Sequence, residues 1–168
     1  MTALRIAIIV LATLVVPGLA LGQGAQVAFG GLKHDSSLPV EVTADSLQVN
    51  QADGSAVFTG NVVIGQGDMR LTAARVEVEY AAEGADAAGR ISTMRASGRV
   101  TVVTGADAAE GNEALYTIDT GTIVMTGDVI LTQGQNALSG QRLVVNLEDG
   151  TGVMEGRVKT IFQTGGSE

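Results

Sequence analysis

A short run built around a glycine recurs along the chain, and this recurrence limits the possible folds more than any other feature. The run "FTGNVVIGQG" (Phe58–Gly67) returns as "MTGDVILTQG" (Met125–Gly134), with weaker copies at "ASGRVTVVTG" (Ala96–Gly105) and "MEGRVKTIFQ" (Met154–Gln163). The shared glycine falls at Gly60, Gly98, Gly127 and Gly156, at intervals of 38, 29 and 29 residues. A recurring interval indicates one structural unit that is used several times.

The repeated unit has the pattern of a β-hairpin. Val76–Tyr80 reads "VEVEY", a strict alternation of apolar and polar residues that is typical of a half-buried strand. Turn signals separate such runs at Ala52–Ser55, Asp119–Gly121 and Glu148–Thr151. The glycine run forms the second arm of each hairpin. The first arms are predicted at Ala44–Asn50, Ala73–Tyr80, Asn112–Asp119 and Ser139–Asp149.

A glycine inside a strand usually marks a bulge or a sharp bend. The same bend in every hairpin predicts an elongated, twisted, all-β antiparallel structure with a concave or enclosed face. The first glycine interval exceeds the others by nine residues, and Ala81–Gly89 ("AAEGADAAG") is about that long. We therefore predict that Ala81–Gly89 is a surface insertion in a hairpin loop. Gly105–Asn112 ("GADAAEGN") is predicted to be an ordinary turn.

The first residues have the pattern of a cleavable secretory signal. A positive charge at Arg5 precedes the unbroken apolar run Ile6–Val16, and small residues follow at Ala20–Gly22. The run is shorter than the roughly 20 apolar residues that a spanning helix needs. We predict a signal peptide at 1–22, a flexible lead-in at 23–38, a β-domain at 39–163 and a polar tail at 164–168. An uncleaved anchor is the alternative. Cleavage would leave a periplasmic protein that starts at Gln23.

Composition argues against several classes of function. The net charge of −8 becomes −9 when Arg5 is removed with the signal, which argues against a nucleic-acid partner. The absence of cysteine excludes thiolate metal sites and thiol catalysis, and the single histidine, His34, lies in the lead-in. Glu77 and Glu79 share one face of a strand, where a solvated outer face is the expected role. No catalytic residue, metal site or cofactor is predicted, and the chain is not expected to be an enzyme.

The apolar faces of the strands are built from Val, Leu, Ile and few aromatic residues. Such an interior is either a plain β-core or, if these side chains do not fill it, a place for a lipid chain. The residues predicted to line a lipid path are Val40, Val42, Leu47, Phe58, Val62, Ile64, Val78, Tyr80, Val102, Tyr116, Ile118, Met125, Val129, Leu131, Leu143 and Val145.

Two long segments resemble a known family. They are "LPVEVTADSLQVNQADGSAVFTGNVVIGQGDMRLTAARVEVEY" (Leu38–Tyr80) and "LYTIDTGTIVMTGDVILTQGQNALSGQRLVVNL" (Leu115–Leu147). Their order of Ala-Asp-x-Leu and Thr-Gly-Asn-Val-x-Ile-x-Gln-Gly is similar to the LptA (OstA-like) family of periplasmic lipopolysaccharide-transport proteins, over about two-thirds of the chain. The same repeat occurs in the inner-membrane and outer-membrane components of that pathway. The chain departs from the family at Ala81–Gly89 and in its short C-terminus after Phe162.

The resemblance implies a β-jellyroll with a V-shaped section, open at both ends. It also implies carriage of lipopolysaccharide from the inner to the outer membrane, with the lipid A acyl chains inside. The family's lipid-contacting positions fall on Val40, Val42, Tyr116 and Ile118. An acidic carrier has weak attraction for the anionic lipid A phosphates, so apolar contact is the expected source of affinity.

Three alternatives remain at this point. A small outer-membrane β-barrel shares the signal and the alternation, but it needs two aromatic girdles and would place Glu77, Asp128 and Arg99 in lipid. A structural β-repeat protein with a dry core would carry no lipid. An inner-membrane component of the same pathway would retain the apolar run Ile6–Val16.

The two ends of an open jellyroll predict self-association. Pro39–Ala44 and Gly156–Gln163 are expected to be the first and last strands, with unpaired edges that invite strand addition. The edge residues are Val40, Val42, Val158, Ile161 and Phe162. A continuous lipid track favours a head-to-tail contact, which gives open filaments.

Overall fold

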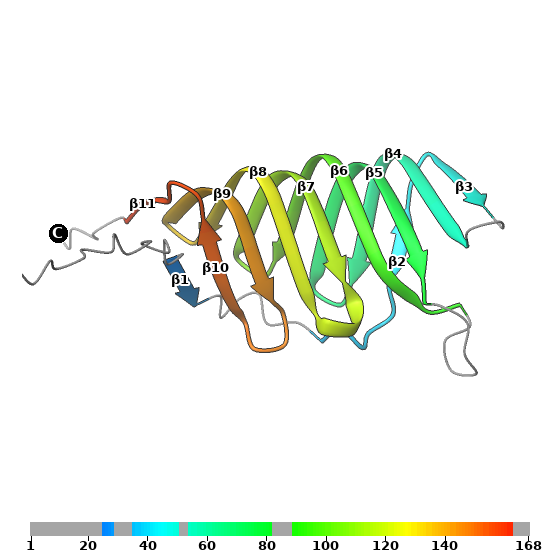
Figure 1. Cartoon of the computed structure of the whole chain (residues 1–168), viewed down its shortest axis with the longest axis horizontal. Coiled ribbons are helices and arrows are strands. Elements are labelled where there is room, and N and C mark those ends of the chain that lie inside the picture. The colour runs from blue at the N-terminus through cyan, green and yellow to red at the C-terminus, as the bar shows by residue number, and fades with distance from the viewer. Residues whose placement is uncertain (1–24, 29–34, 51–53, 82–88, 163–168) are drawn as a thin grey trace, which may run out of the picture.

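The computed structural model describes residues 25–28, 35–50, 54–81 and 89–162, and it shows an open antiparallel sheet of 11 strands (Figure 1). This confirms the predicted all-β class. The strands are β1 (Ala25–Ala28), β2 (Glu41–Thr43), β3 (Ser46–Asn50), β4 (Ser55–Gln66), β5 (Met69–Tyr80), β6 (Ile91–Thr104), β7 (Asp107–Thr117), β8 (Thr122–Gln133), β9 (Asn136–Asn146), β10 (Thr151–Glu155) and β11 (Lys159–Ile161). A short 3-10 turn, η1 (Ile118–Thr120), joins β7 to β8.

The six long strands β4 to β9 follow one another in space in the same order as in sequence. Each pairs with its sequence neighbour in an antiparallel register, for example Phe58 with Val76 between β4 and β5. The resulting stack of hairpins forms the elongated body in Figure 1. The repeat found in the sequence is therefore the repeat of the architecture.

The recurring glycine is the corner of every second strand: it lies in β4, β6 and β8, and between β10 and β11. Gly60, Gly98, Gly127 and Gly156 all have φ between 81 and 84 degrees, and each is followed by a second residue with positive φ. The pairing register shifts at these points, as between Thr59 and Val62 of β4. A backbone of this kind favours glycine because a side chain is strained there. The predicted bend is confirmed.

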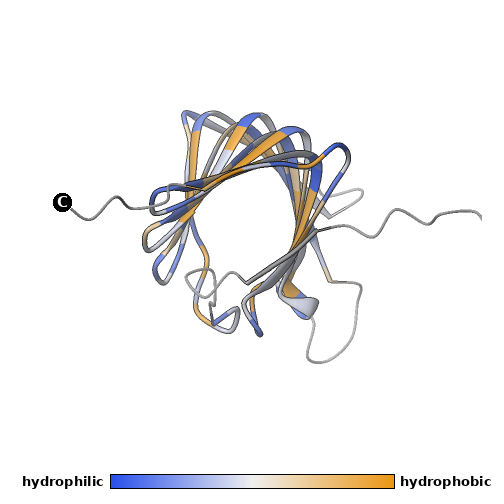
Figure 2. Cartoon of the chain, turned by 90° about the vertical axis from the view of Figure 1, so that its left-hand side faces the viewer, coloured by the Kyte–Doolittle hydropathy of each residue, from blue (hydrophilic) through white to orange (hydrophobic). Residues whose placement is uncertain are grey.

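The corners divide the sheet into two walls. The first wall holds the strand halves that end at the turns of Gly67, Gly105 and Gly134, and includes β2 and β11. The second wall holds the halves that end at the loops 81–90, 118–121 and 147–150, and includes β1, β3 and β10. Figure 2, which looks along the stack, shows the arched section that the walls form together.

The core lies between the walls, on the inner face that alternation selects. Its fully buried large side chains include Ile64, Leu71, Tyr116, Leu131 and Leu143. Pairing explains their convergence, since Ile64 faces Leu71 across β4 and β5, and Leu71 in turn faces Val102. Removal of such apolar area from water is the main term that holds the walls together.

The strands of the first wall are longer than predicted, because three tight turns carry no Asp-Gly signal. Gly67, Gly105 and Gly134 each begin a two-residue loop with φ between 52 and 59 degrees. Our prediction of a turn over Gly105–Asn112 is wrong, since β7 begins at Asp107. A glycine at the first position of the loop lets the chain reverse at once.

At each end of the stack the terminal strand is broken into two pieces. β2 and β3 both pair with β4, on opposite sides of its corner, and β10 and β11 both pair with β9. The last strand predicted over Gly156–Gln163 is shorter in the structure, where β11 covers only Lys159–Ile161 and Gly156 is the corner that separates it from β10.

The segment 23–38, predicted to be a flexible lead-in, contains β1. This strand pairs with β10 from Ala25 with Met154 to Ala28 with Thr151. The edge of β10 supplies the hydrogen-bond partners of β1, and the sequence alone gives no sign of this pairing. The insertion predicted at Ala81–Gly89 falls between β5 and β6, and its residues 82–88 lie outside the described residues, as do the signal at 1–22 and the tail at 164–168.

Candidate functional site: a cavity at the mouth of the apolar interior

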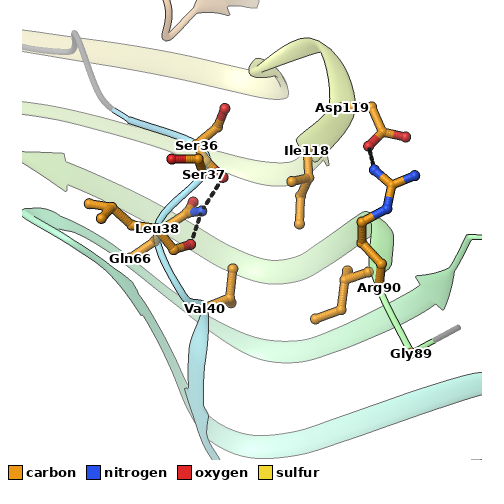
Figure 3. A pocket seen from close by; sticks show the side chains of 10 residues that line it. Ser36, Ser37, Leu38, Val40, Gln66, Gly89, Arg90, Ile118 and Asp119 are labelled. Atoms are coloured by element: carbon orange, nitrogen blue, oxygen red, sulfur yellow. Dashed lines mark hydrogen bonds and ion pairs between the residues drawn. The ribbon is translucent and has the colours of Figure 1, made fainter. Parts of the chain in front are cut away.

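A cavity of about 400 Å³ lies beside the segment that precedes β2 (Figure 3). Four segments supply its lining: the chain before β2, the end of β4, the start of β6 and η1. The residues are Ser36, Ser37, Leu38, Val40, Gln66, Gly89, Arg90, Ile91, Ile118 and Asp119. A volume of this size lies within the range of small-molecule pockets.

The glycine corners explain why these segments meet. Gln66 is the last residue of β4, at the rim of the first wall, and Tyr116 lies near the end of β7, at the rim of the second. Because the sheet bends at the glycine corners, the two rims face each other across the interior. The Tyr116 hydroxyl donates a hydrogen bond of 2.9 Å to Oε1 of Gln66. This bond links the two walls through residues that are 50 positions apart in sequence.

The amide of Gln66 also holds the chain that precedes β2. Its Nε2 donates to the backbone carbonyls of Ser36 and Leu38, each at 2.8 Å. Figure 3 shows the Gln66 side chain lying against this segment. Gln66 is 1% exposed and Tyr116 is not exposed at all, so these two side chains are buried, whereas Leu38 is 41% exposed. A buried amide that makes all three bonds meets the requirement that interior polar groups be paired.

Burial raises the pKa of Tyr116 to about 12, because desolvation disfavours the phenolate. The hydroxyl is protonated at neutral pH, as that of an ordinary tyrosine is, and the raised pKa keeps it protonated in alkaline solution as well. It remains a donor to Gln66, and the amide keeps its NH₂ group directed at the segment before β2.

The outer rim of the cavity is polar. Arg90, just before β6, forms an ion pair with Asp119 of η1, which Figure 3 marks with a dashed line. Both side chains are about half exposed, so the pair is worth little to stability. Its position leaves one charged patch beside an entrance whose inner lining, Val40, Ile91 and Ile118, is apolar.

The residues predicted to line a lipid path fall into three groups. Most are buried between the walls: Val62, Ile64, Val78, Val102, Tyr116, Met125, Val129, Leu131, Leu143 and Val145. Val40, Val42, Phe58 and Ile118 are half-buried against this core. Leu47 and Tyr80 lie at strand positions that face inward by alternation. They are nevertheless 53% and 40% exposed, because they lie at open margins of the second wall.

The predicted edge residues are also divided. Val40, Val42 and Val158 pack partly against the core, whereas Ile161 and Phe162 are 54% and 70% exposed at the β11 end. Leu47 and Val49 of β3 give the opposite end a similar exposed apolar pair. The edge of β10 is occupied by β1.

Sequence reasoning missed three parts of the site: Gln66, the segment Ser36–Leu38 and the ion pair of Arg90 with Asp119. One signal was present, since Gln66 follows Val62 and Ile64 at alternate positions and so points inward. Within the described residues there is no group of acidic or histidine side chains that could hold a metal ion. In the same residues no helix is long and apolar enough to cross a membrane.

Comparison with known proteins gives a family match and a fold match. Residues 41–151 match the sequence model of the family described as LptA/(LptD N-terminal domain) LPS transport protein. An uncharacterized protein of Rhizobium meliloti (strain 1021) is 30% identical over 111 residues, which are 64% of this chain and 60% of that protein. The chain thus spans less than two-thirds of that relative's length.

The fold is similar to that of LptH from Pseudomonas aeruginosa, described as the LptA-homologous periplasmic component of the lipopolysaccharide transport device. The TM-score is 0.67 at 20% sequence identity, with 77% of this chain and 98% of LptH covered. At this identity the likeness concerns the fold.

Proposed function

Because the chain belongs to the LptA/LptD N-terminal domain family of LPS transport proteins, we propose that it is a periplasmic carrier that holds the acyl chains of lipopolysaccharide between its two walls. The family match bears out the resemblance read from the sequence. The observation that carries the proposal is the cavity of about 400 Å³, with a polar rim and the apolar side chains of Val40, Ile91 and Ile118 inside, beside the buried apolar core. Acyl chains would gain affinity there by removal of apolar surface from water.

The path of the lipid follows from the lining. Val40 and Ile118, both matched to lipid-contacting positions of the family, border the cavity, and Val42 and Tyr116 lie beside it. The acyl chains would run inward from Val40 and Ile118, while the sugars would stay at the exposed rim near Arg90 and Asp119. Binding needs no covalent step, in keeping with a carrier rather than an enzyme.

Photo-crosslinking tests this path in cells. A photoreactive amino acid at Val42 or Ile118 is expected to label lipopolysaccharide, because both side chains face the interior. The same probe at Glu77 should give no label, since Glu77 is exposed on the outer face, where it is paired with Arg75. Mass spectrometry of lipid extracted from the native protein gives an independent readout. Equal labelling at Glu77, or a purified protein without lipid, would favour a dry-core structural role.

The proposed carrier would hand lipid to and from other proteins that share its repeat in the inner and outer membranes. A copy that retains Ile6–Val16 as an anchor would instead be the inner-membrane member of that pathway. We further propose that copies join head to tail, so that their grooves form one track. The exposed apolar residues at the two ends, Leu47 with Val49 and Ile161 with Phe162, support such contacts.

End-blocked variants test the assembly. Leu47→Asp should block one end and Phe162→Asp the other, because a charge at an apolar contact is costly to bury. Each variant alone is expected to sediment as a monomer, whereas the equimolar mixture should form a dimer and nothing larger, through the one intact end of each partner. Filaments from either variant alone, or no association of the wild-type protein at any concentration, would contradict the head-to-tail contact.

A further inference from the structure

Gln66 is an anomaly within the apolar interior. It is the one glutamine among the buried residues of the described chain, and it lies at the mouth of the cavity rather than in a turn. Its side chain makes three hydrogen bonds, one received from Tyr116 and two donated to Ser36 and Leu38. A purely apolar core would gain nothing from this amide, and an unpaired buried amide is costly.

The segment that Gln66 holds is lightly packed. Leu38 is 41% exposed and Ser37 and Pro39 are also exposed. The cavity of about 400 Å³ lies on one side of the segment, and a second of about 350 Å³, lined by Leu38, Pro39 and Arg70 among others, lies on the other. The nearby turn, in which Asp35 accepts from the backbone N–H of Ser37 at 2.9 Å, is local. The two bonds from Gln66 therefore fix this segment to the rim of β4.

Any lipid that enters at this point meets the amide of Gln66. If the segment Ser36–Leu38 moves aside and lipid takes its place, the two N–H groups of Gln66, a residue that is 1% exposed, lose their acceptors. A hydrocarbon chain offers no acceptor, so its entry would leave the amide unpaired. An acyl ester or amide carbonyl can accept in the same way as the backbone carbonyl that it replaces.

We propose that Gln66 recognises the acyl carbonyls of the lipid, which replace the backbone carbonyls of Ser36 and Leu38 on its Nε2. The inference rests on the carrier function proposed above and names the chemical feature that the site selects. With a carbonyl at Gln66, the hydrocarbon beyond it runs along Val40, Ile91 and Ile118, and the sugar side faces the rim of Arg90 and Asp119. Tyr116 is a positioning residue, because its hydroxyl occupies Oε1 and leaves both donors free for the lipid.

The repeat supplies a matched control. Gln133 ends β8 as Gln66 ends β4, and each is followed by a glycine that begins a turn. The amide of Gln133 donates to Asp107 at 3.0 Å, a partner within the same wall. Gln133→Leu thus removes a rim amide of the same kind from a place outside the cavity lining.

Two lipids that differ only in their carbonyls test the proposal. One is a glucosamine lipid with ester-linked chains, and the other is its ether-linked twin of equal chain length. The wild-type protein is expected to bind the ester about tenfold more tightly, since about 1.4 kcal/mol, within the net range of one hydrogen bond, is a factor of ten. Gln66→Leu should bring the ratio close to one, while Gln133→Leu should keep it.

Tyr116→Phe adds a measurement if Gln66→Leu does not fold. This change keeps the ring and frees the amide to turn, so the ester preference should fall to roughly threefold. If the ratio of ester to ether affinity were the same in the wild type, Gln66→Leu and Tyr116→Phe, and all three still bound lipopolysaccharide, Gln66 would have no role in recognition. The carrier function would remain intact. A loss of preference in Gln133→Leu as large as in Gln66→Leu would also overturn it. Failure of lipopolysaccharide and both twins to bind the wild type would overturn the carrier function itself.

Discussion

Replacement of Gly98 by alanine is expected to lower the melting temperature of the protein by roughly 10 °C. Gly98 has a φ of 84 degrees, and a Cβ placed there would lie 2.6 Å from the Cβ of Ala74 on β5. A left-handed alanine costs about 1 kcal/mol and overpacking typically adds 1–3, so a total of about 3 kcal/mol is expected. The neighbour is a short side chain that cannot swing away, and relief requires the backbone of the corner to move. Thermal unfolding followed by circular dichroism measures the effect.

Gly105→Ala separates the two contributions. Gly105 begins the turn between β6 and β7 with a φ of 59 degrees, but nothing lies within 4 Å of its added Cβ. Gly105→Ala therefore carries only the conformational cost. We expect it to lower the free energy of unfolding by about 1 kcal/mol, a third of the loss at Gly98. If the two variants melted at the same temperature, close packing at the corner would not be what selects glycine there.

Replacement of Ile118 by aspartate is expected to weaken lipid binding roughly 30-fold, the effect of about 2 kcal/mol for an unpaired polar group in an apolar site. Ile118 lines the cavity from η1 and packs partly against the core. Arg90, the cation that lines the same cavity, is already paired with Asp119, so a new carboxylate would have to compete for it. Its alternative is to take up a proton through a raised pKa, which also costs free energy at neutral pH.

Ile130→Asp is the matched control for this loss. Ile130 is 47% exposed on the outer face of β8, so the same substitution introduces a solvated carboxylate. Lipid binding of Ile130→Asp should equal that of the wild type, measured by retention of lipopolysaccharide on the purified protein. Equal losses in both variants would show that Ile118 holds no special place on the path. Equal retention would show that acyl chains do not pass it.

The overall architecture could be predicted because its two determinants are local. Alternation over runs such as Val76–Tyr80 sets which face is buried, and the spacing of Gly60, Gly98, Gly127 and Gly156 sets where every second strand turns. Both features lie within one strand and its neighbour. The turn at Gly105 was less visible, since its second residue, Ala106, gives no turn signal, whereas Gly67 with Asp68 is a hairpin signal that our prediction did not use.

The site depended on contacts that have no local signature. Gln66 reaches Ser36 and Leu38 across 30 and 28 residues, and its partners there are backbone carbonyls, which every residue carries. Arg90 and Asp119 are 29 residues apart and belong to different loops. Alternation along β4 placed Gln66 on the inner face, whereas a polar amide side chain is more often found at the surface. Only the folded walls show that the amide has partners inside.

Because the molecule is a stack of hairpins, its length can change only in steps of one hairpin. Each repeat contributes two strands, and strands lie about 4.8 Å apart, so one repeat lengthens the groove by about 10 Å. The insertion predicted at Ala81–Gly89 adds residues between β5 and β6 and no length, because these strands remain neighbours from Met69 with Thr104 to Tyr80 with Ile91, with register shifts between Thr72 and Arg75 and between Glu79 and Tyr80. A longer conduit is therefore reached by whole repeats or by whole additional copies. Gene duplication of one unit and end-to-end assembly are, in geometric terms, the same operation.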